Sequence, residues 1–338
     1  MKAAQFDMTS QKVVINDVPI PEPNHDQFLV KIRAASLCHS DLMVDTRPAS
    51  GGPFTMGHEG VGYIERMGPG AENRGFQVGD AVGFLYVIGC CYECEGCSIQ
   101  NVFCTTGKPL FQGFMADGFF AEYAVVNWQN AAKLPSSMDI RRSSPLFCAG
   151  ITAFNTIDSC ELQPGQWLAV VGCGGLGQFA TQYAKAMGYK VVGIDINDSV
   201  LQVCKRLGAD AVFNSRTDEN YVEELKALTN GGVHTAAVFS GSNVAYAGAP
   251  AILRTGGLLM LVGLPPKPVE ISALPFCLGA YRIKGESIGT PRRMQKAIDF
   301  TAKHNIVPDV DFRDLDDLES IVEDLKQGKV TTRIAFLF

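Results

Sequence analysis

A glycine-rich turn in the middle of the chain constrains the fold more than any other feature. Gly172, Gly174 and Gly177 fit the pattern G-x-G-x-x-G, and an apolar run at residues 168–171 precedes them. Apolar residues then recur at helical spacing over residues 176–187. In such a turn, the first glycine permits a sharp bend, the second lets a pyrophosphate approach the backbone, and the third lets helix and strand pack closely. The pattern therefore predicts a strand, a turn and a helix that bind a dinucleotide, with Gly175 and Leu176 inside the turn.

The segments that follow continue this alternation. A strand is expected at 191–194, a helix at 200–207 that Gly208 ends, and further strands at 236–239 and 258–262. Repeats of this kind indicate a parallel, doubly wound sheet. Asp195 ends the second strand, 18 residues after Gly177. An acid at this place accepts hydrogen bonds from an adenosine ribose and repels a 2′-phosphate, which favours NAD over NADP. The simpler alternative is a turn in an α/β protein with an unrelated ligand.

The segments before and after this middle region do not share its alternation of strands and helices. Residues 1–149 contain short apolar runs, such as 27–32 and 60–64, separated by Gly and Pro, and no long helical period. Small barrels and sandwiches have this pattern. Beyond about residue 285 the alternation fades, and helices near 292–303 and 315–326 precede an apolar end at 334–338. A length of 338 residues also suggests about two domains.

Eleven cysteines in a chain with no secretion signal favour metal binding over disulfides. Cys91-x2-Cys94-x2-Cys97-x6-Cys104 supplies four thiolates within a short loop, which is typical of structural zinc. Cys90 is an alternative to Cys91 as the first ligand, and packed or reactive thiols are the simpler explanation. Four further cysteines have no partner nearby in the sequence and are expected to pack as small apolar residues: Cys160, Cys173, Cys204 and Cys277.

A second constellation has a different composition. Cys38, His58 and Cys148 offer two sulfurs and one nitrogen, which would leave a fourth position open for water or substrate at a catalytic zinc. Asp41 is placed to hold the His58 ring in the required tautomer. Glu59 would approach the metal when the water position is empty. A cysteine in the sequence context of Cys148 is more often a buried apolar thiol than a metal ligand. Its assignment as a ligand therefore depends on the presence of Cys38 and His58.

Charge and hydropathy exclude other classes of protein. A net charge of −6 argues against a nucleic-acid partner. No apolar run approaches the ~18 residues of a membrane helix. The first residues lack the apolar core of a signal peptide. We therefore expect a cytoplasmic protein that binds neither nucleic acid nor membranes.

Together these residues resemble the zinc-dependent alcohol dehydrogenases of the medium-chain dehydrogenase/reductase family. The resemblance runs the length of the chain, through residues 38–41, 57–59, the cysteine cluster, 146–152, the glycine turn, 261–265 and 328–333. It implies an α/β protein with a GroES-like β-barrel catalytic domain, residues 1–149 and 286–338. A Rossmann NAD-binding domain, residues 150–285, interrupts it in the sequence.

The resemblance also implies roles for individual residues. Two zinc ions per chain are expected, one catalytic at Cys38, His58 and Cys148, with Glu59 nearby, and one structural at the four-cysteine cluster. Ser40 would hydrogen-bond the substrate oxygen and take its proton, and Tyr86 would form an aromatic wall of the substrate pocket. Contacts to NAD are expected from residues outside the glycine turn as well: His39 and Arg333 at the pyrophosphate, Thr152 at the nicotinamide, and Val262.

The implied reaction is hydride transfer between a primary or secondary alcohol, or its aldehyde or ketone, and NAD. The partner is then a small molecule, and a homo-oligomer, either tetramer or dimer, is expected by analogy. Three alternatives share parts of the pattern: an NADP-dependent aldehyde reductase, a zinc-free quinone or enoyl reductase, and a non-catalytic, zinc-stabilised nucleotide-binding relative.

Three departures from the family pattern stand out. The last interval of the cysteine cluster holds six residues where seven are usual, and the stretch between Cys38 and His58 is short. Met43 stands where many members carry a histidine that ends a proton relay, and a thioether cannot shuttle a proton. Aromatic residues that could line an apolar pocket, or belong to an ordinary core, are Phe54, Tyr86, Phe103, Phe111 and Phe114.

Overall fold

A computed structural model describes residues 1–46 and 53–338, without the side chains of residues 44–46. The chain divides into two compact units, one of residues 1–151 and 289–338, the other of residues 152–288. Helix α2 (Ala149–Asp158) contains the first of these divisions. Within the described ranges, no helix is both long and apolar enough to cross a membrane.

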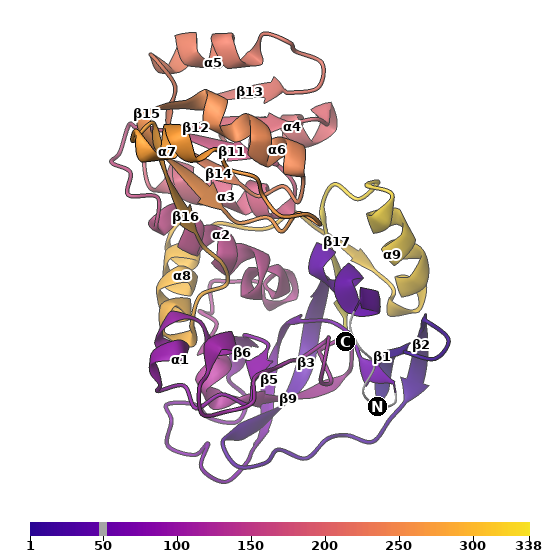
Figure 1. Ribbon diagram of the computed structural model, residues 1–338. Coiled ribbons are helices and arrows are strands. Elements are labelled where there is room, and N and C mark those ends of the chain that lie inside the picture. The colour runs from indigo at the N-terminus through magenta and orange to yellow at the C-terminus, as the bar shows by residue number, and fades with distance from the viewer. Residues whose placement is uncertain (47–52) are drawn as a thin grey trace. The chain divides into compact units, whose positions relative to one another are not determined.

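Residues 152–288, all of them described, form one parallel sheet of six strands (Figure 1). The order β13-β12-β11-β14-β15-β16 reverses direction between β11 and β14, and ligands of such sheets bind beyond the carboxyl ends of the strands at that point. The predicted doubly wound sheet is confirmed. Its strands are β11 (Trp167–Val171), β12 (Lys190–Asp195), β13 (Ala211–Asn214), β14 (Val233–Val238), β15 (Leu253–Leu261) and β16 (Tyr281–Gly285).

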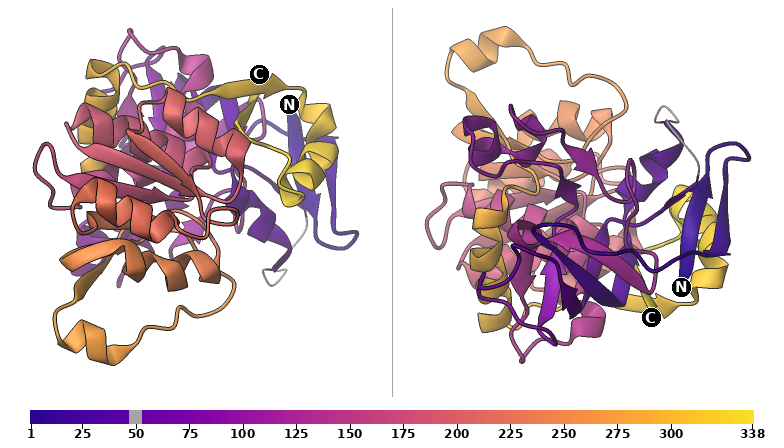
Figure 2. Two further views of the ribbon diagram at one scale, coloured as in Figure 1. Left: turned by 90° about the horizontal axis from the view of Figure 1, so that it is seen from above. Right: turned by 90° about the horizontal axis from the view of Figure 1, so that it is seen from below.

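Helices lie on both faces of this sheet (Figure 2). Helix α3 (Gly175–Ala186) buries Phe179, Ala180 and Tyr183, which belong to the face that the sequence period predicts. Helix α4 (Asp198–Arg206) begins where the Asn197 side chain accepts a hydrogen bond from the Ser199 N–H at 3.0 Å. The remaining helical segments are α5 (Tyr221–Thr229), α6 (Asn243–Gly248), η6 (Ala249–Ile252) and α7 (Ala273–Cys277).

The first unit is built mainly from strands. Its described part holds a seven-stranded sheet, a three-stranded sheet and one short pair. The seven strands are β10 (Ala131–Lys133), β6 (Ala81–Phe84), β5 (Glu59–Met67), β3 (Gln27–Leu37), β18 (Arg333–Leu337), β17 (Val310–Arg313) and β9 (Tyr123–Asn127). The others are β1 (Lys2–Asp7), β2 (Lys12–Asp17) and β4 (Phe54–Thr55), with β7 (Val87–Ile88) paired to β8 (Leu110–Phe111).

Short helices connect these strands. The helical segments of the first unit are η1 (His39–Thr46), α1 (Glu95–Ile99), η2 (Asn101–Phe103), η3 (Trp128–Asn130), η4 (Ile140–Arg142), η5 (Ser144–Phe147), α8 (Pro291–Lys303), η7 (Leu315–Asp317) and α9 (Leu318–Lys326). Phe28, Phe84, Phe119, Phe120 and Phe336 are fully buried in its apolar core.

The end of the chain is part of this unit. Strand β18 pairs antiparallel with β3, from Ile334 opposite Leu37 to Leu337 opposite Ala34. Strand β5 pairs with the other edge of β3, where Ser36 lies opposite Glu59. Residues from three distant parts of the sequence therefore meet where β3 ends.

Three of the four isolated cysteines are buried as expected: Cys160, Cys173 and Cys204. Cys277 is exposed, so the expectation that it packs in a core is wrong. It ends α7, a short helix that buries none of its residues.

Candidate active site

Four potential metal ligands gather at the end of β3. Cys38 follows β3, His58 directly precedes β5, Glu59 begins β5, and Cys148 follows η5. One ligand atom of each lies within 4.8 Å of the others. The pairing of β3 with β5 explains how Cys38 and His58 meet, because it places the end of one strand beside the start of the other.

The buried carboxylate of Asp41 orients His58. Asp41 Oδ1 lies 2.6 Å from His58 Nδ1, and Asp41 Oδ2 accepts the backbone N–H of Cys38 at 2.8 Å. A carboxylate on Nδ1 favours the tautomer that leaves the lone pair on Nε2. That Nε2 atom is buried and has no hydrogen-bond partner among the described residues. Because an unpaired buried acceptor costs about 1–3 kcal/mol, the geometry fits a ligand that fills this position.

The pKa values of the two thiols and of His58 are all strongly shifted, and Cys38 is the thiol that is shifted toward the thiolate. A hydrogen bond from the Cys148 thiol lowers the pKa of Cys38 well below its ordinary value, although burial acts in the opposite direction. The same interaction raises the pKa of Cys148. Burial would lower the pKa of His58, but the Asp41 carboxylate raises it well above the usual range. Two sulfurs and one imidazole nitrogen are the donor set that zinc prefers.

Glu59 forms an ion pair with Arg333, which lies on the last strand, β18. Its carboxylate is fully buried and accepts hydrogen bonds from Arg333 Nη2, at 2.7 Å on Oε1 and 2.6 Å on Oε2, and from the Ser36 hydroxyl. Burial raises the pKa of Glu59 to about 7, while the Arg333 charge lowers it. The structure thus places Arg333, the predicted pyrophosphate contact, against Glu59. Sequence reasoning missed Ser36, for which the signal was a lone hydroxyl in the apolar segment 34–37.

Aromatic rings surround His58. The ring centroids of Tyr86 and Phe114 each lie 4.9 Å from that of His58, and Phe111 lies 6.2 Å from Tyr86. Burial raises the pKa of Tyr86 well above its ordinary value, which keeps its phenol neutral. The other two candidate aromatics lie elsewhere, since Phe54 packs on Phe6 and Phe103 is exposed.

The 3₁₀ helix η1 carries the two other predicted residues of this part of the chain. Ser40 is half-buried and His39 is exposed. Met43, also on η1, has an exposed fraction of 40%. Ser40 therefore lies between the buried Cys38 and Asp41 and the exposed surface of the helix.

The second cysteine cluster forms a compact group of sulfurs. The Sγ atoms of Cys91, Cys94, Cys97 and Cys104 all lie within 4.8 Å of one another, and Cys91–Cys97, Cys94–Cys104 and Cys91–Cys104 are 4.0, 4.0 and 3.7 Å apart. A zinc–sulfur bond of ~2.3 Å in a tetrahedron implies sulfurs ~3.8 Å apart. The backbone N–H of Thr105 lowers the pKa of Cys94 to about 5, and that of Cys91 lowers the pKa of Cys104 to about 7. Such thiolates are ready to bind a metal.

Cys90 is not one of these four grouped sulfurs. Its Sγ donates to the carbonyl of Asn101 at 3.2 Å and lies 3.6 Å from that of Ile88. Burial raises the pKa of Cys90 to about 11, which favours the neutral thiol. The structure thus places Cys91, and not Cys90, among the four sulfurs.

The glycine turn has the close contacts expected of a dinucleotide site. Gly172 has a φ of +92°, and a Cβ there would lie 2.7 Å from the Ser240 nitrogen. A Cβ on Gly177 would lie 2.1 Å from the Gly172 oxygen. On the exposed side, a Cβ on Gly174, the N-cap of α3, would meet no atom within 4 Å. The turn therefore leaves space for a phosphate at the helix N-terminus.

A cavity of about 400 Å³ opens beside this turn, lined by Gly172, Asp195 and residues of the loop after β13, of α5 and of α6. Asp195 lies at the end of β12, as predicted, and its Oδ2 accepts the N–H of Cys173 at 2.8 Å. Thr152 is buried on α2, and Val262 follows β15, where its N–H donates to the Tyr246 hydroxyl at 3.2 Å.

Asp41→Asn is expected to weaken zinc binding at the Cys38 site about 10- to 100-fold, because the amide no longer fixes and charges the His58 ring. Competition with a chromophoric zinc chelator measures the affinity. Asp139→Asn, which breaks an exposed pair with Arg141, serves as the matched control. Unchanged affinity in Asp41→Asn would contradict the role of Asp41.

Comparisons with known proteins agree with this geometry. A family described as "Alcohol dehydrogenase GroES-like domain" matches residues 24–136, and one described as "Zinc-binding dehydrogenase" matches residues 175–303. An alcohol dehydrogenase from Geobacillus stearothermophilus is 34% identical over 342 residues, which cover 99% of this chain and 98% of the relative. This chain belongs to the zinc-binding alcohol dehydrogenases of the medium-chain dehydrogenase/reductase family. The predicted fold class, a GroES-like domain with a Rossmann-like parallel sheet, is confirmed.

Other members of the family are similar over their full length. An alcohol dehydrogenase from Rhizobium meliloti (strain 1021) is 34% identical and aligns with 99% of this chain and 98% of its own. The crystal structure of the alcohol dehydrogenase from Aeropyrum pernix has a TM-score of 0.88 at 29% identity, with complete coverage of both chains. Family membership and the two ligand clusters support zinc binding.

Proposed function

We propose that this chain transfers a hydride between a primary or secondary alcohol, or its aldehyde or ketone, and NAD. One observation carries the proposal: the buried, unpartnered Nε2 of His58 lies with the sulfurs of Cys38 and Cys148 in one cluster. When bound there, zinc would supply Lewis-acid polarisation of the substrate oxygen, and NAD would supply the hydride acceptor.

The chain's own residues then hold the reactants and move the proton. Cys38, His58 and Cys148 would hold the metal, with Glu59 beside it. The Ser40 hydroxyl would accept the alcohol proton at Oγ as it releases its own proton toward water. Tyr86, with Phe111 and Phe114, would exclude water and offer an apolar wall to the carbon skeleton of the substrate.

Cofactor binding is assigned to residues 150–285 and catalysis to residues 1–149 with 286–338. Asp195 would bind the adenosine ribose. The glycine turn and His39 would bind the pyrophosphate. Thr152 and Val262 would contact the nicotinamide end of the cofactor. Arg333 would also contact the pyrophosphate; its Nη2 donates to Glu59, and its buried Nε has no partner among the described residues. The four-cysteine cluster would hold a second, structural zinc.

A cytoplasmic homo-oligomer, dimer or tetramer, completes the proposal. Exposed apolar side chains support self-association, because Leu274, Phe276 and Leu278 have exposed fractions of 67%, 46% and 76% beside the edge strand β16. Clusters of this kind often mark protein interfaces.

A panel of alcohols and aldehydes, each tested with both nicotinamide cofactors, examines the proposed function. We expect zinc-dependent turnover, two zinc ions per chain by elemental analysis, and a higher kcat/KM with NAD(H) than with NADP(H). Absence of turnover with every substrate would support a non-catalytic nucleotide-binding relative. Preference for NADPH would instead make the chain an aldehyde reductase and contradict the role of Asp195.

A further inference from the structure

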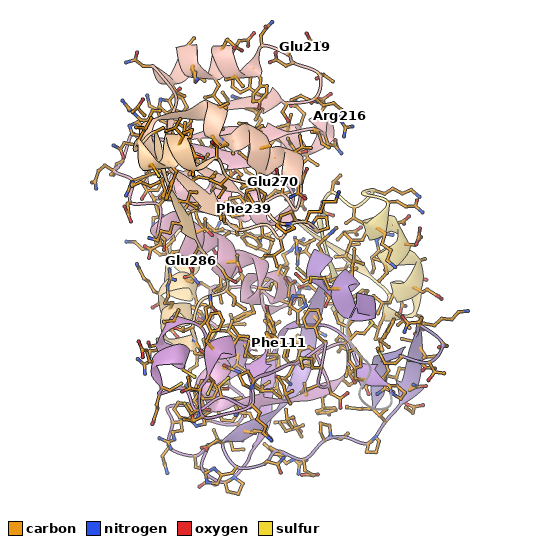
Figure 3. The ribbon with its side chains drawn as sticks, viewed as in Figure 1. Phe111, Arg216, Glu219, Phe239, Glu270 and Glu286 are labelled. Atoms are coloured by element: carbon orange, nitrogen blue, oxygen red, sulfur yellow. The ribbon has the colours of Figure 1, made fainter. Side chains whose placement is uncertain are left out.

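The cavity beside the glycine turn contains a cation as well as an acid. Asp195, at the end of β12, and Arg216, on the loop after β13, both line it. Figure 3 shows Arg216 on this loop. An acid at the end of the second strand favours NAD, whereas an arginine nearby accommodates the additional phosphate of NADP. This chain places both in one cavity.

Asp195 has little hydrogen-bonding capacity left for a ribose. Its Oδ2 accepts the N–H of Cys173 at 2.8 Å, and its Oδ1 accepts those of Ile196 and Asn197 at 2.7 and 3.1 Å. A carboxylate offers about four acceptor sites, so about one remains. A ribose diol has two hydroxyls, and the second needs another partner at this end of the cavity.

Backbone contacts hold Arg216 next to that position. Asn214 pairs with Asp195 across β13 and β12, and the Ser215 N–H donates to the Asp195 carbonyl at 3.0 Å. The Asn214 side chain accepts the Arg216 N–H at 3.0 Å and donates to Asp198 at 2.6 Å. The loops after β12 and β13 are thus tied together, and Arg216 stays at the Asp195 end of the cavity.

We propose that Arg216 determines how strongly the cavity discriminates between NAD and NADP. This inference rests on the proposed function, because it assumes a nicotinamide dinucleotide with its ribose at Asp195. The guanidinium donates to the ribose hydroxyl that Asp195 cannot serve, and it pairs with a 2′-phosphate in NADP. It thereby offsets the repulsion between that phosphate and the Asp195 carboxylate. The enzyme prefers NAD but binds NADP measurably.

Direct binding measurements test this role without turnover. NADH and NADPH are titrated by nucleotide fluorescence against the wild type, Arg216→Ala and Arg216→Lys, at low and high salt. We expect Arg216→Ala to raise the Kd for NADPH about 10- to 100-fold and that for NADH by less than about 3-fold. Arg216→Lys should lie between, since it keeps the charge but loses the planar fork. Salt should weaken NADPH binding more in the wild type than in Arg216→Ala.

Arg206→Ala, on the exposed end of α4 and outside the cavity lining, is the matched control and should leave both Kd values unchanged. Equal losses of NADH and NADPH binding in Arg216→Ala would overturn the inference, and so would a wild type that binds NADH but no NADPH. A wild type that binds neither dinucleotide would instead contradict the proposed function and, with it, this inference.

Discussion

Cys38→Ser is expected to abolish alcohol turnover while NADH binding persists. Serine supplies a neutral hydroxyl in place of the thiolate, and a neutral hydroxyl oxygen is a far weaker zinc ligand than a thiolate sulfur. Zinc content should fall from two ions per chain to one. Because a catalytic metal supplies several kcal/mol of transition-state stabilisation, we expect kcat/KM to drop by roughly 10⁴-fold or more.

Cys277→Ser is the matched control for this experiment. It makes the same atomic change at an exposed cysteine of the second unit, so both zinc ions and full activity should remain. NADH binding, followed by fluorescence, should be equal in the two variants. Full turnover by Cys38→Ser with one zinc per chain would show that the metal acts elsewhere.

Cys94→Ser should lower the thermal stability of the protein and should not act directly on the catalytic step. The loop from Cys91 to Cys104 contains only two short helical segments, α1 and η2, with little buried apolar surface. The metal would therefore be its main source of order. Structural zinc contributes about 10–16 kcal/mol in small zinc-finger peptides, so even partial loss here should lower the unfolding temperature by more than about 10 °C. Calorimetry and zinc analysis measure both effects.

Cys90→Ser is the control in the same loop. Its sulfur contacts backbone carbonyls and lies outside the cluster, so this variant should keep two zinc ions and nearly the wild-type unfolding temperature. If Cys90→Ser lost zinc as completely as Cys94→Ser, the assignment of Cys91 as a ligand would be wrong.

Local patterns predicted the parts of the molecule that depend on neighbours in sequence. The glycine turn, the α3 face and the spacing of Cys94, Cys97 and Cys104 are encoded within a few residues, where backbone periodicity decides the outcome. The choice between Cys90 and Cys91 was open because spacing does not reveal where adjacent side chains point. The exposure of Cys277 was missed because it depends on what covers α7.

Long-range contacts were less predictable from sequence. The ion pair of Glu59 with Arg333 joins residues 274 positions apart, and no local sequence pattern predicts it. Ser36 became part of the site through the register of β3 with β5. Arg216 is one exposed cation among 29 lysines and arginines, and only the pairing of β12 with β13 places it next to Asp195.

The position of β18 has a consequence for the order of folding. Glu59 is buried beside Cys38, yet its counter-charge belongs to the last strand of the chain. During synthesis, more than 270 residues must follow Glu59 before Arg333 exists. Until β18 adds to β3, that carboxyl group is buried without its ion-pair partner, which costs free energy. The second unit is formed wholly by residues 152–288, so its folding does not depend on β18. It can fold before the C-terminal strand completes the surroundings of the metal ligands.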